Sequence, residues 1–137
     1  MLNINTDVLL VGLGKVGMMY DVESPSFKTH VSSIIKTKSL NLIGAVDKSQ
    51  IKRNFFEKKF KKPVFSNFLQ AVNNLKPSVL VIAVDTNNTK KIYNNIINKK
   101  FFFKIIIFEK PVSNNLQIVK KIFDYCKKKK IIVFVNY

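Results

Sequence analysis

An α/β fold with a doubly wound parallel sheet, in a single three-layer domain, is predicted by three features of the sequence. Short apolar runs alternate with segments of helical periodicity along the chain, which is typical of βαβ units with helices on both faces of the sheet. The first apolar run, Val8 to Val11, leads into glycines spaced G-x-G-x-x-G. The length of 137 residues suits one domain, so we expect residues 1–137 to form it and no second domain to fit.

The apolar runs predict the strands in order. They are Val8 to Val11, Leu42 to Val46, Val64 and Phe65, Val79 to Val84, Phe101 to Phe108 with Ile105 to Ile107 most secure, and Ile131 to Val135. Continuous apolar residues, in place of strict alternation, indicate strands that are buried on both faces. The sheet should therefore lie in the centre of the domain.

Apolar residues at helical spacing predict helices between these strands. They begin after Gly17, at Thr29 (to Thr37), at Gln50 (to Lys61, with Ile51 inward), at a cap on Ser66 or Asn67 (to Pro77), at Lys90 (to Lys99) and at Asn114 (with Leu116 inward). The first helix breaks at Ser24-Pro25, which predicts an inserted loop. Asp85 to Thr89 is predicted to be a polar turn at the carboxyl end of a central strand, where open α/β sheets bind ligands.

Each glycine of the first turn has a physical task in a Rossmann-type dinucleotide site. Gly12 makes the tight turn, Gly14 lets the backbone approach a pyrophosphate, and Gly17 lets the following helix pack close to the strand. The spacing also occurs by chance, so the interpretation requires a strand before, a helix after and an acidic residue further on.

Asp47, at the tip of the second strand, supplies that acidic residue. Its carboxylate can accept hydrogen bonds from ribose hydroxyls and would repel a 2′-phosphate, which favours NAD and leaves NADP possible, because Lys48 softens the discrimination. The separation from Gly14 exceeds the usual distance of about 20 residues, and the loop near Pro25 accounts for the excess. The alternative is that Asp47 caps the following helix.

The strong positive charge is not taken as evidence for nucleic acid. The net charge is +16, yet Arg53 is the only arginine, whereas nucleic-acid surfaces typically use arginine and stacking aromatics. The abundance of Lys, Asn, Ile and Phe fits A/T-rich codons, and Lys127 to Lys130 read as a solvated helix end. A nucleic-acid partner is therefore not expected.

The sequence also predicts the cellular compartment and whether the chain holds a metal site. No apolar run approaches the length of about 18 residues that a membrane span needs, and residues 1–7 lack the pattern of a signal peptide. Cys126 is the only cysteine, so it forms no internal disulfide and no metal cluster. We expect a cytoplasmic protein without a membrane partner or a metal site.

With these features in order, the chain resembles the N-terminal nucleotide-binding domain of the glucose–fructose oxidoreductase / inositol dehydrogenase (Gfo/Idh/MocA) family. The resemblance covers essentially the whole chain. It rests on the glycine turn, Asp47, the Phe56 to Phe60 run (Phe-Glu-Lys-Lys-Phe) before Pro63-Val64-Phe65, the turn after Ala83, Glu109-Lys110-Pro111, and Asn136-Tyr137 after the last strand. In this order and spacing, the set is specific.

The resemblance implies hydride transfer between a nicotinamide and a sugar, cyclitol or related hydroxyl carbon. Lys110 would reach the nicotinamide and the substrate and support proton transfer, Glu109 would lie by the cofactor, and Pro111 would fix the turn. The alternative is that these three form an exposed strand end. The full set of expected cofactor-binding residues is Gly12, Leu13, Gly14, Lys15, Val16, Gly17, Asp47, Ala83, Asp85, Thr86, Asn88, Glu109, Lys110 and Pro111.

The chain departs from the family in three ways. The segment from Ala83 to Thr89 lacks the usual proline and histidine, and Asp85 would weaken binding of phosphates. His30 resembles the family's histidine after the glycine turn, displaced by the insertion, and is expected to be structural. The family's C-terminal α/β domain, which supplies the substrate pocket, the acid–base histidine and usually the oligomer interface, is expected to be absent.

Two consequences follow from that expected absence. The chain should bind cofactor but not turn over substrate by itself, because catalysis needs both halves. Its apolar edge should be exposed, which predicts self-association. The alternative function is a non-catalytic nucleotide-binding or protein-interaction module, and a weaker one is a basic nucleic-acid-associated protein.

Overall fold

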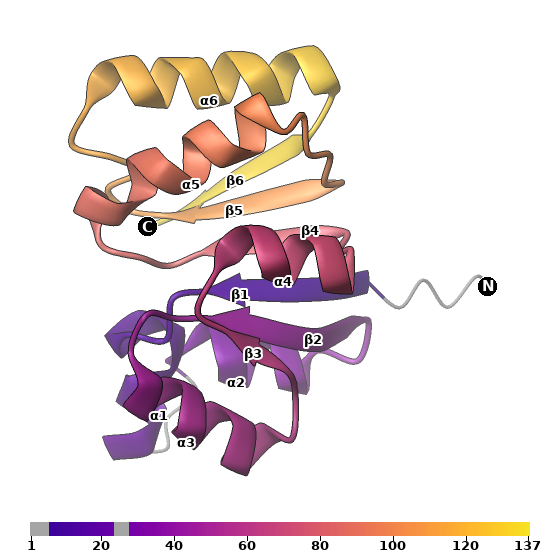
Figure 1. Ribbon diagram of the computed structural model, residues 1–137, viewed down its shortest axis with the longest axis vertical. Helices are drawn as coiled ribbons and strands as arrows, with labels where there is room; N and C mark the ends of the chain where they lie inside the picture. The colour runs from indigo at the N-terminus through magenta and orange to yellow at the C-terminus, as the bar shows by residue number, and fades with distance from the viewer. Residues whose placement is uncertain (1–5, 24–27) are drawn as a thin grey trace.

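The computed structural model describes residues 6–23 and 28–137. Within them, six strands form one parallel sheet in the order β3-β2-β1-β4-β5-β6 (Figure 1). The strands are β1 (Thr6–Val11), β2 (Leu40–Val46), β3 (Val64–Phe65), β4 (Val79–Ile82), β5 (Ile105–Glu109) and β6 (Ile132–Asn136). The strand order reverses between β1 and β4, so the predicted Rossmann-type doubly wound fold is confirmed.

Helices cover both faces of this sheet (Figure 1). They are the π-helix η1 (Lys15–Met19), α1 (Tyr20–Glu23), α2 (His30–Lys36), α3 (Gln50–Phe60), α4 (Phe68–Leu75), α5 (Thr86–Asn98) and α6 (Leu116–Lys129). Apolar residues of α4, α5 and α6 pack on one face, and those of η1, α2 and α3 pack on the other. The domain therefore has three layers.

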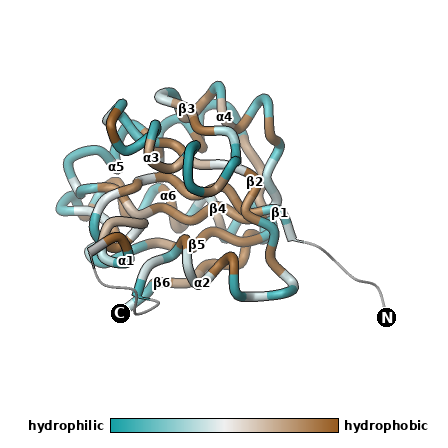
Figure 2. Tube along the Cα trace, turned by 90° about the horizontal axis from the view of Figure 1, so that it is seen from below, coloured by the Kyte–Doolittle hydropathy of each residue, from teal (hydrophilic) through white to brown (hydrophobic). Residues whose placement is uncertain are grey.

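The core divides along the alternation of the central strand. Leu9 and Val11 face α4, α5 and α6, whereas Val8 and Leu10 face η1, α2 and α3. All four side chains are almost completely buried, as expected for a strand covered on both faces. Figure 2 shows the same arrangement as hydrophobic residues through the middle of the molecule and hydrophilic residues on its loops.

Side-chain caps begin four of the helices. Thr29, Ser49, Asn67 and Asn115 each accept a hydrogen bond from the backbone N–H three residues later, which satisfies a donor that the helix itself leaves unpaired. Asn67, and not Ser66, therefore caps α4. Ser49, and not Asp47, caps α3, which leaves the Asp47 side chain for other contacts.

Some of the expectations about these elements were wrong. The expected polar turn at Asp85 to Thr89 is the start of α5, which begins at Thr86 and not at Lys90. Ile51 and Leu116 were expected to face inward, but they are 82% and 83% exposed. Both lie in the first turn of their helices. The loop expected at Ser24-Pro25 falls outside the described residues, and the next helix begins at His30, with the expected first residue, Thr29, as its cap.

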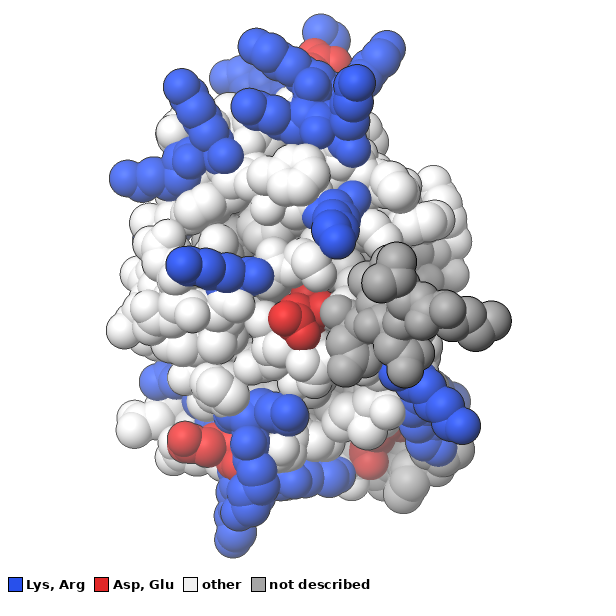
Figure 3. All heavy atoms as spheres, turned by 90° about the vertical axis from the view of Figure 1, so that its right-hand side faces the viewer, with Lys and Arg blue, Asp and Glu red and all other residues white. Residues whose placement is uncertain are grey.

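Lysines gather where the helices end. The last turn of α3 carries Lys58 and Lys59, and that of α6 carries Lys127 to Lys129. In Figure 3 these helix ends form two basic groups at opposite ends of one face, with mostly uncharged surface between them. Cations at helix C-termini interact favourably with the negative end of the helix dipole.

No helix in residues 6–23 and 28–137 has the length and apolar character needed to cross a membrane.

Candidate functional site

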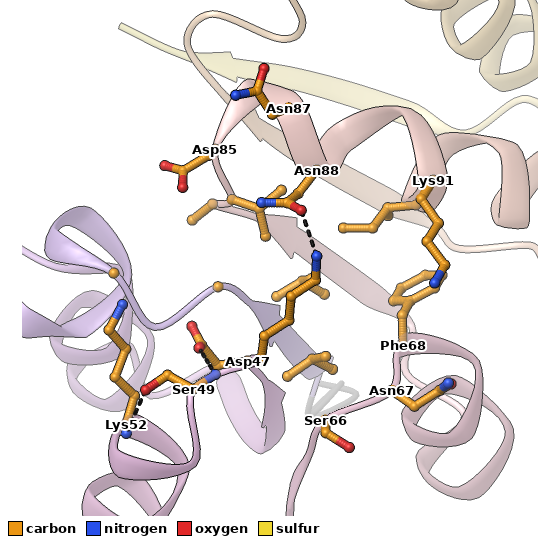
Figure 4. Close-up of a pocket in the computed structure, with 18 of the residues that line it drawn as sticks. Asp47, Ser49, Lys52, Ser66, Asn67, Phe68, Asp85, Asn87, Asn88 and Lys91 are labelled. Atoms are coloured by element: carbon orange, nitrogen blue, oxygen red, sulfur yellow. Dashed lines mark hydrogen bonds between the residues drawn. The ribbon is translucent and has the colours of Figure 1, made fainter.

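A cavity of about 710 Å³ opens at the carboxyl ends of β1, β2 and β4 (Figure 4). Its walls come from the turn after β1, the connections after β2 and β3, and the first turns of α5. The strand order reverses between β1 and β4, and this topological switch point is where doubly wound sheets bind their ligands. Its place at the switch point makes this cavity the candidate ligand-binding site.

The glycine turn forms the inner wall of the cavity. Gly12 has φ of +104°, and a Cβ added to it would lie 2.2 Å from the Ala83 carbonyl oxygen. A Cβ on Gly17 would lie 2.1 Å from the Gly12 carbonyl oxygen, so a side chain at either position would force the backbone to shift. A Cβ on Gly14 would meet no atom within 4 Å. The turn is thus tightly packed at Gly12 and Gly17 and open at Gly14, which lines the cavity.

The half-buried carboxylate of Asp47 is fixed at the edge of this cavity. Its Oδ2 accepts a hydrogen bond from the Leu13 N–H at 2.8 Å, and its Oδ1 accepts one from the Ser49 N–H at 2.7 Å. Arg53 Nη1 donates to the backbone oxygens of Asp47 and Lys48 and holds the same turn. An ionised carboxylate offers about four acceptor positions, so both oxygens can still accept a hydrogen bond from a ligand.

A lysine reaches across the cavity. Lys48 Nζ donates to Asn88 Oδ1 at 2.6 Å (dashed in Figure 4) and joins the end of β2 to the start of α5. Lys52 and Lys91 also line the cavity, as does Asp85. Asp85 occupies the cap position of α5 without making a side-chain cap hydrogen bond. The walls therefore combine cationic and anionic groups.

The ends of β5 and β6 form a second polar group at the same edge of the sheet, outside the cavity lining. Glu109 Oε1 accepts hydrogen bonds from His30 Nε2 at 2.5 Å and from Asn136 Nδ2 at 2.6 Å. Lys110 follows with an exposed side chain, and the Lys110–Pro111 peptide is cis. His30, expected to be structural, is thus paired with the acidic residue of the Glu-Lys-Pro motif.

Tyr93 supports the segment after this motif. Its hydroxyl donates to the Val112 carbonyl oxygen at 2.6 Å, and burial raises the pKa of Tyr93 well above its usual value. The phenol therefore stays protonated and remains a donor at physiological pH. Because Tyr93 lies on α5, this hydrogen bond ties the Glu-Lys-Pro segment to the helix that walls the cavity.

The structure brings some of the expected cofactor-binding residues to the cavity and not others. Gly12, Gly14, Asp47, Ala83, Asp85 and Asn88 line it. Leu13, Lys15, Val16 and Gly17 belong to the glycine turn and the start of η1 without lining it, and the Thr86 carbonyl oxygen is engaged by the Thr89 hydroxyl. Glu109, Lys110 and Pro111 lie at the end of β5, at the same edge.

Several lining residues were not predicted. Ser49, Ser66 and Asn67 follow the carboxyl ends of β2 and β3, so the rule that ligands bind at those ends could have found them. Phe68 and Lys91 lie on helices and read as ordinary core and surface residues, with no sequence signal. Among the described residues there is no group of three or more His, Cys, Asp or Glu side chains placed to hold a metal ion.

Comparisons with known proteins agree with this geometry. The family described as "Oxidoreductase family, NAD-binding Rossmann fold" (Gfo/Idh/MocA) matches residues 6–137. A search of curated proteins gives no match. Similar solved structures include the WlbA dehydrogenase from Chromobacterium violaceum in complex with NADH and UDP-GlcNAcA, with 12% identity over 99% of this chain and 36% of that chain and a TM-score of 0.78.

Two further structures give the same result. A probable dehydrogenase from Thermotoga maritima shares 18% identity over 95% of this chain and 35% of its own, with a TM-score of 0.77. The scyllo-inositol dehydrogenase from Lactobacillus casei shares 14% identity over 99% of this chain and 37% of its own, with a TM-score of 0.76. At these identities the likeness concerns the fold, and the chain spans about a third of the length of these proteins.

The glycine turn, the acidic residue after β2 and the cavity between them are the features on which a Rossmann domain binds a dinucleotide, and the match to the family covers the described domain. NAD is the cofactor of this family. The chain belongs to the Gfo/Idh/MocA oxidoreductase family and corresponds to its NAD-binding Rossmann domain.

Proposed function

We propose that this chain binds NAD as part of an oxidoreductase that moves a hydride between the nicotinamide and the hydroxyl carbon of a sugar, a cyclitol or a related compound. Asp47 is the observation that carries the proposal. Its carboxylate is held by two backbone N–H groups at the mouth of the cavity and faces the open glycine turn.

The residues present fit the adenosine half of a dinucleotide. The space beside Gly14, into which no neighbouring atom intrudes, leaves room for a phosphate to approach the backbone. Asp47 would accept hydrogen bonds from ribose hydroxyls, and Val46 and Phe68 offer apolar surface in the cavity. Asp85 opposes phosphate binding electrostatically, whereas Lys48, Lys52 and Lys91 favour it.

When bound, NAD supplies the hydride acceptor or donor of the reaction. Lys110 would serve the substrate: its ammonium is exposed at the carboxyl edge of the sheet, where a cation stabilises negative charge that develops on an oxygen. Tyr93 and the Glu109 contacts hold the segment on both sides of Lys110. Lys110 is therefore the residue of this chain for which we propose a catalytic role.

Turnover would also need a second domain. The relatives of known structure are about three times as long as this chain, and we propose that a further domain supplies the substrate pocket. Among the described strands, β6 lies at the edge of the sheet beside β5, and its Ile132 and Phe134 are each 55% exposed. We expect the chain to associate with itself or with that domain through this edge, and we propose a cytoplasmic location.

Calorimetric titration with NAD and NADP tests the proposal. We expect binding of NAD in the micromolar range, and a loss of roughly tenfold or more for Asp47→Ala, because a hydrogen bond to a charged group contributes about 1.5–3 kcal/mol. Asp124→Ala is the matched control, since Asp124 is an exposed carboxylate on α6 that forms an ion pair with Lys120.

Two results would contradict the proposal. One is the absence of binding of either dinucleotide to the folded chain. The other is a loss of affinity in Asp124→Ala as large as that in Asp47→Ala. Because Asp47 also accepts the Leu13 N–H, a thermal unfolding curve is recorded for each variant to show that it is folded at the temperature of the titration.

A further inference from the structure

We propose that His30 and Asn136 are positioning residues for the nicotinamide half of the dinucleotide. They hold the Glu109 carboxylate by one oxygen and leave the other oxygen to accept a hydrogen bond from the nicotinamide riboside. This inference rests on the proposed function, because it assumes that a dinucleotide occupies the site. It adds a role for His30 and Asn136, which do not line the cavity.

The two contacts converge on a single atom of Glu109. His30 Nε2 lies 2.5 Å from Oε1, and Asn136 Nδ2 lies 2.6 Å from the same Oε1. The side chains of His30 and Glu109 are only 14% and 15% exposed. Glu109 and Asn136 are direct partners in the register of β5 and β6, so the sheet itself sets one of the two contacts.

The chemistry of these groups assigns the proton. An ionised carboxylate accepts hydrogen bonds and does not donate them, so the facing His30 Nε2 carries the hydrogen. Oε1 thereby receives two donors. Oε2 receives no hydrogen bond from any residue in 6–23 or 28–137. A carboxylate held in this way has a fixed orientation and a remaining acceptor.

His30 is itself held in place through the start of α2. The Asp21 carboxylate accepts hydrogen bonds from the N–H groups of Lys28 and Thr29, both at 3.1 Å. It also accepts hydrogen bonds from the hydroxyls of Thr29 and Ser32. Thr29 caps α2 and is almost completely buried. Because His30 is the next residue, these contacts limit the movement of its imidazole ring relative to the sheet.

The place of Glu109 in the sheet points to the nicotinamide half. In a doubly wound sheet, the two halves of a dinucleotide lie on either side of the switch point, which here falls between β1 and β4. Asp47 follows β2, on one side of this point, and suits the adenosine ribose. Glu109 ends β5, on the other side. The nicotinamide riboside carries donors, namely its ribose hydroxyls and its carboxamide NH₂, and Glu109 Oε2 is an acceptor.

A comparison of three ligands tests this role separately from a structural one. NADH contains both halves of the dinucleotide, whereas ADP-ribose lacks the nicotinamide ring, and ADP lacks the whole nicotinamide riboside. All three are titrated into the wild-type chain and into Glu109→Gln, His30→Ala and His30→Gln. Glu109→Gln keeps an oxygen for His30 and Asn136 but removes the charge, and His30→Gln keeps an N–H donor. Asp124→Asn on α6 is the control for loss of a carboxylate.

We expect Glu109→Gln and His30→Ala to weaken NADH binding by roughly tenfold, as for the loss of a hydrogen bond to a charged group. Binding of ADP should change by less than about twofold, because ADP does not reach the nicotinamide half. His30→Gln should recover part of the loss. If the ribose donates to Oε2, the variants should lose affinity for ADP-ribose as they do for NADH. If the carboxamide donates to Oε2, their affinity for ADP-ribose should change as little as their affinity for ADP. Both results support the proposal.

The outcomes separate the two proposals. Absence of binding of NADH and of ADP to the wild-type chain would overturn the proposed function. Normal binding of both by the wild type, with equal losses for both ligands in the variants and a lower melting temperature, would overturn this inference, because it would show that the contacts only tether α2 to the sheet. Variants that bind NADH as the wild type does would also overturn it.

Discussion

Replacing Gly17 and Gly14 one at a time by alanine should separate packing from binding in the glycine turn. A Cβ on Gly17 would lie 2.1 Å from the Gly12 carbonyl oxygen, and a normal contact requires the two segments to separate by roughly 1.3 Å, which a close-packed interior resists. Overpacking of this kind costs about 1–3 kcal/mol. In an open helix, by contrast, glycine to alanine would stabilise the protein by about 1 kcal/mol.

Gly14→Ala is the matched comparison, because its Cβ would meet no atom within 4 Å and its φ of −72° is accessible to any residue. We expect urea unfolding to show a free energy of unfolding lowered by about 1–3 kcal/mol for Gly17→Ala and changed by less than about 0.5 kcal/mol for Gly14→Ala. Gly14→Ala should instead weaken NAD binding. The reasoning would be refuted if Gly17→Ala were as stable as the wild type, or if Gly14→Ala were the less stable of the two.

Three further predictions concern stability and association. Asn67→Ala should lower the free energy of unfolding by about 0.5–2 kcal/mol in urea titrations, because the cap of α4 is lost. Burial raises the pKa of the Cys126 thiol to about 11 and raises that of Tyr93. The free energy of unfolding, measured at several pH values, should therefore be fully retained below about pH 8.5 and fall as the pH rises toward about 11; a flat profile would contradict this. Phe134→Lys should reduce self-association in sedimentation velocity, because it places a charge on the exposed edge strand, and Lys120→Ala should not.

The architecture of the sheet could be predicted from the sequence, and the reason is physical. The strands are continuous apolar runs because both faces are covered, and this signal does not depend on distant contacts. Asp85 to Thr89 was misread because short polar residues favour turns and helix starts alike. Ile51 and Leu116 fit the apolar period of their helices, but both lie in the first helical turn and are exposed.

Only the site residues that come directly after a strand could be predicted from the sequence. The glycine turn and Asp47 are close to strand termini, so their place at the carboxyl edge follows from the parallel topology. The hydrogen bond between Lys48 and Asn88 spans 40 residues of sequence and that between His30 and Glu109 spans 79. Such contacts depend on how helices pack on the sheet, and no local pattern encodes them.

Mapping of NAD binding by NMR tests the central claim most directly. A chain of 137 residues gives resolved amide resonances after labelling with nitrogen-15, and each one reports on its own surroundings. We expect the largest shifts on addition of NAD at the carboxyl edge of the sheet, at Gly14, Ser49 and Asn88. The amides of Lys58 and Lys128, in the last turns of α3 and α6, should change little. Largest shifts at those lysines, or no shifts at the carboxyl edge with NAD in excess, would contradict the assignment of the cavity as the dinucleotide site.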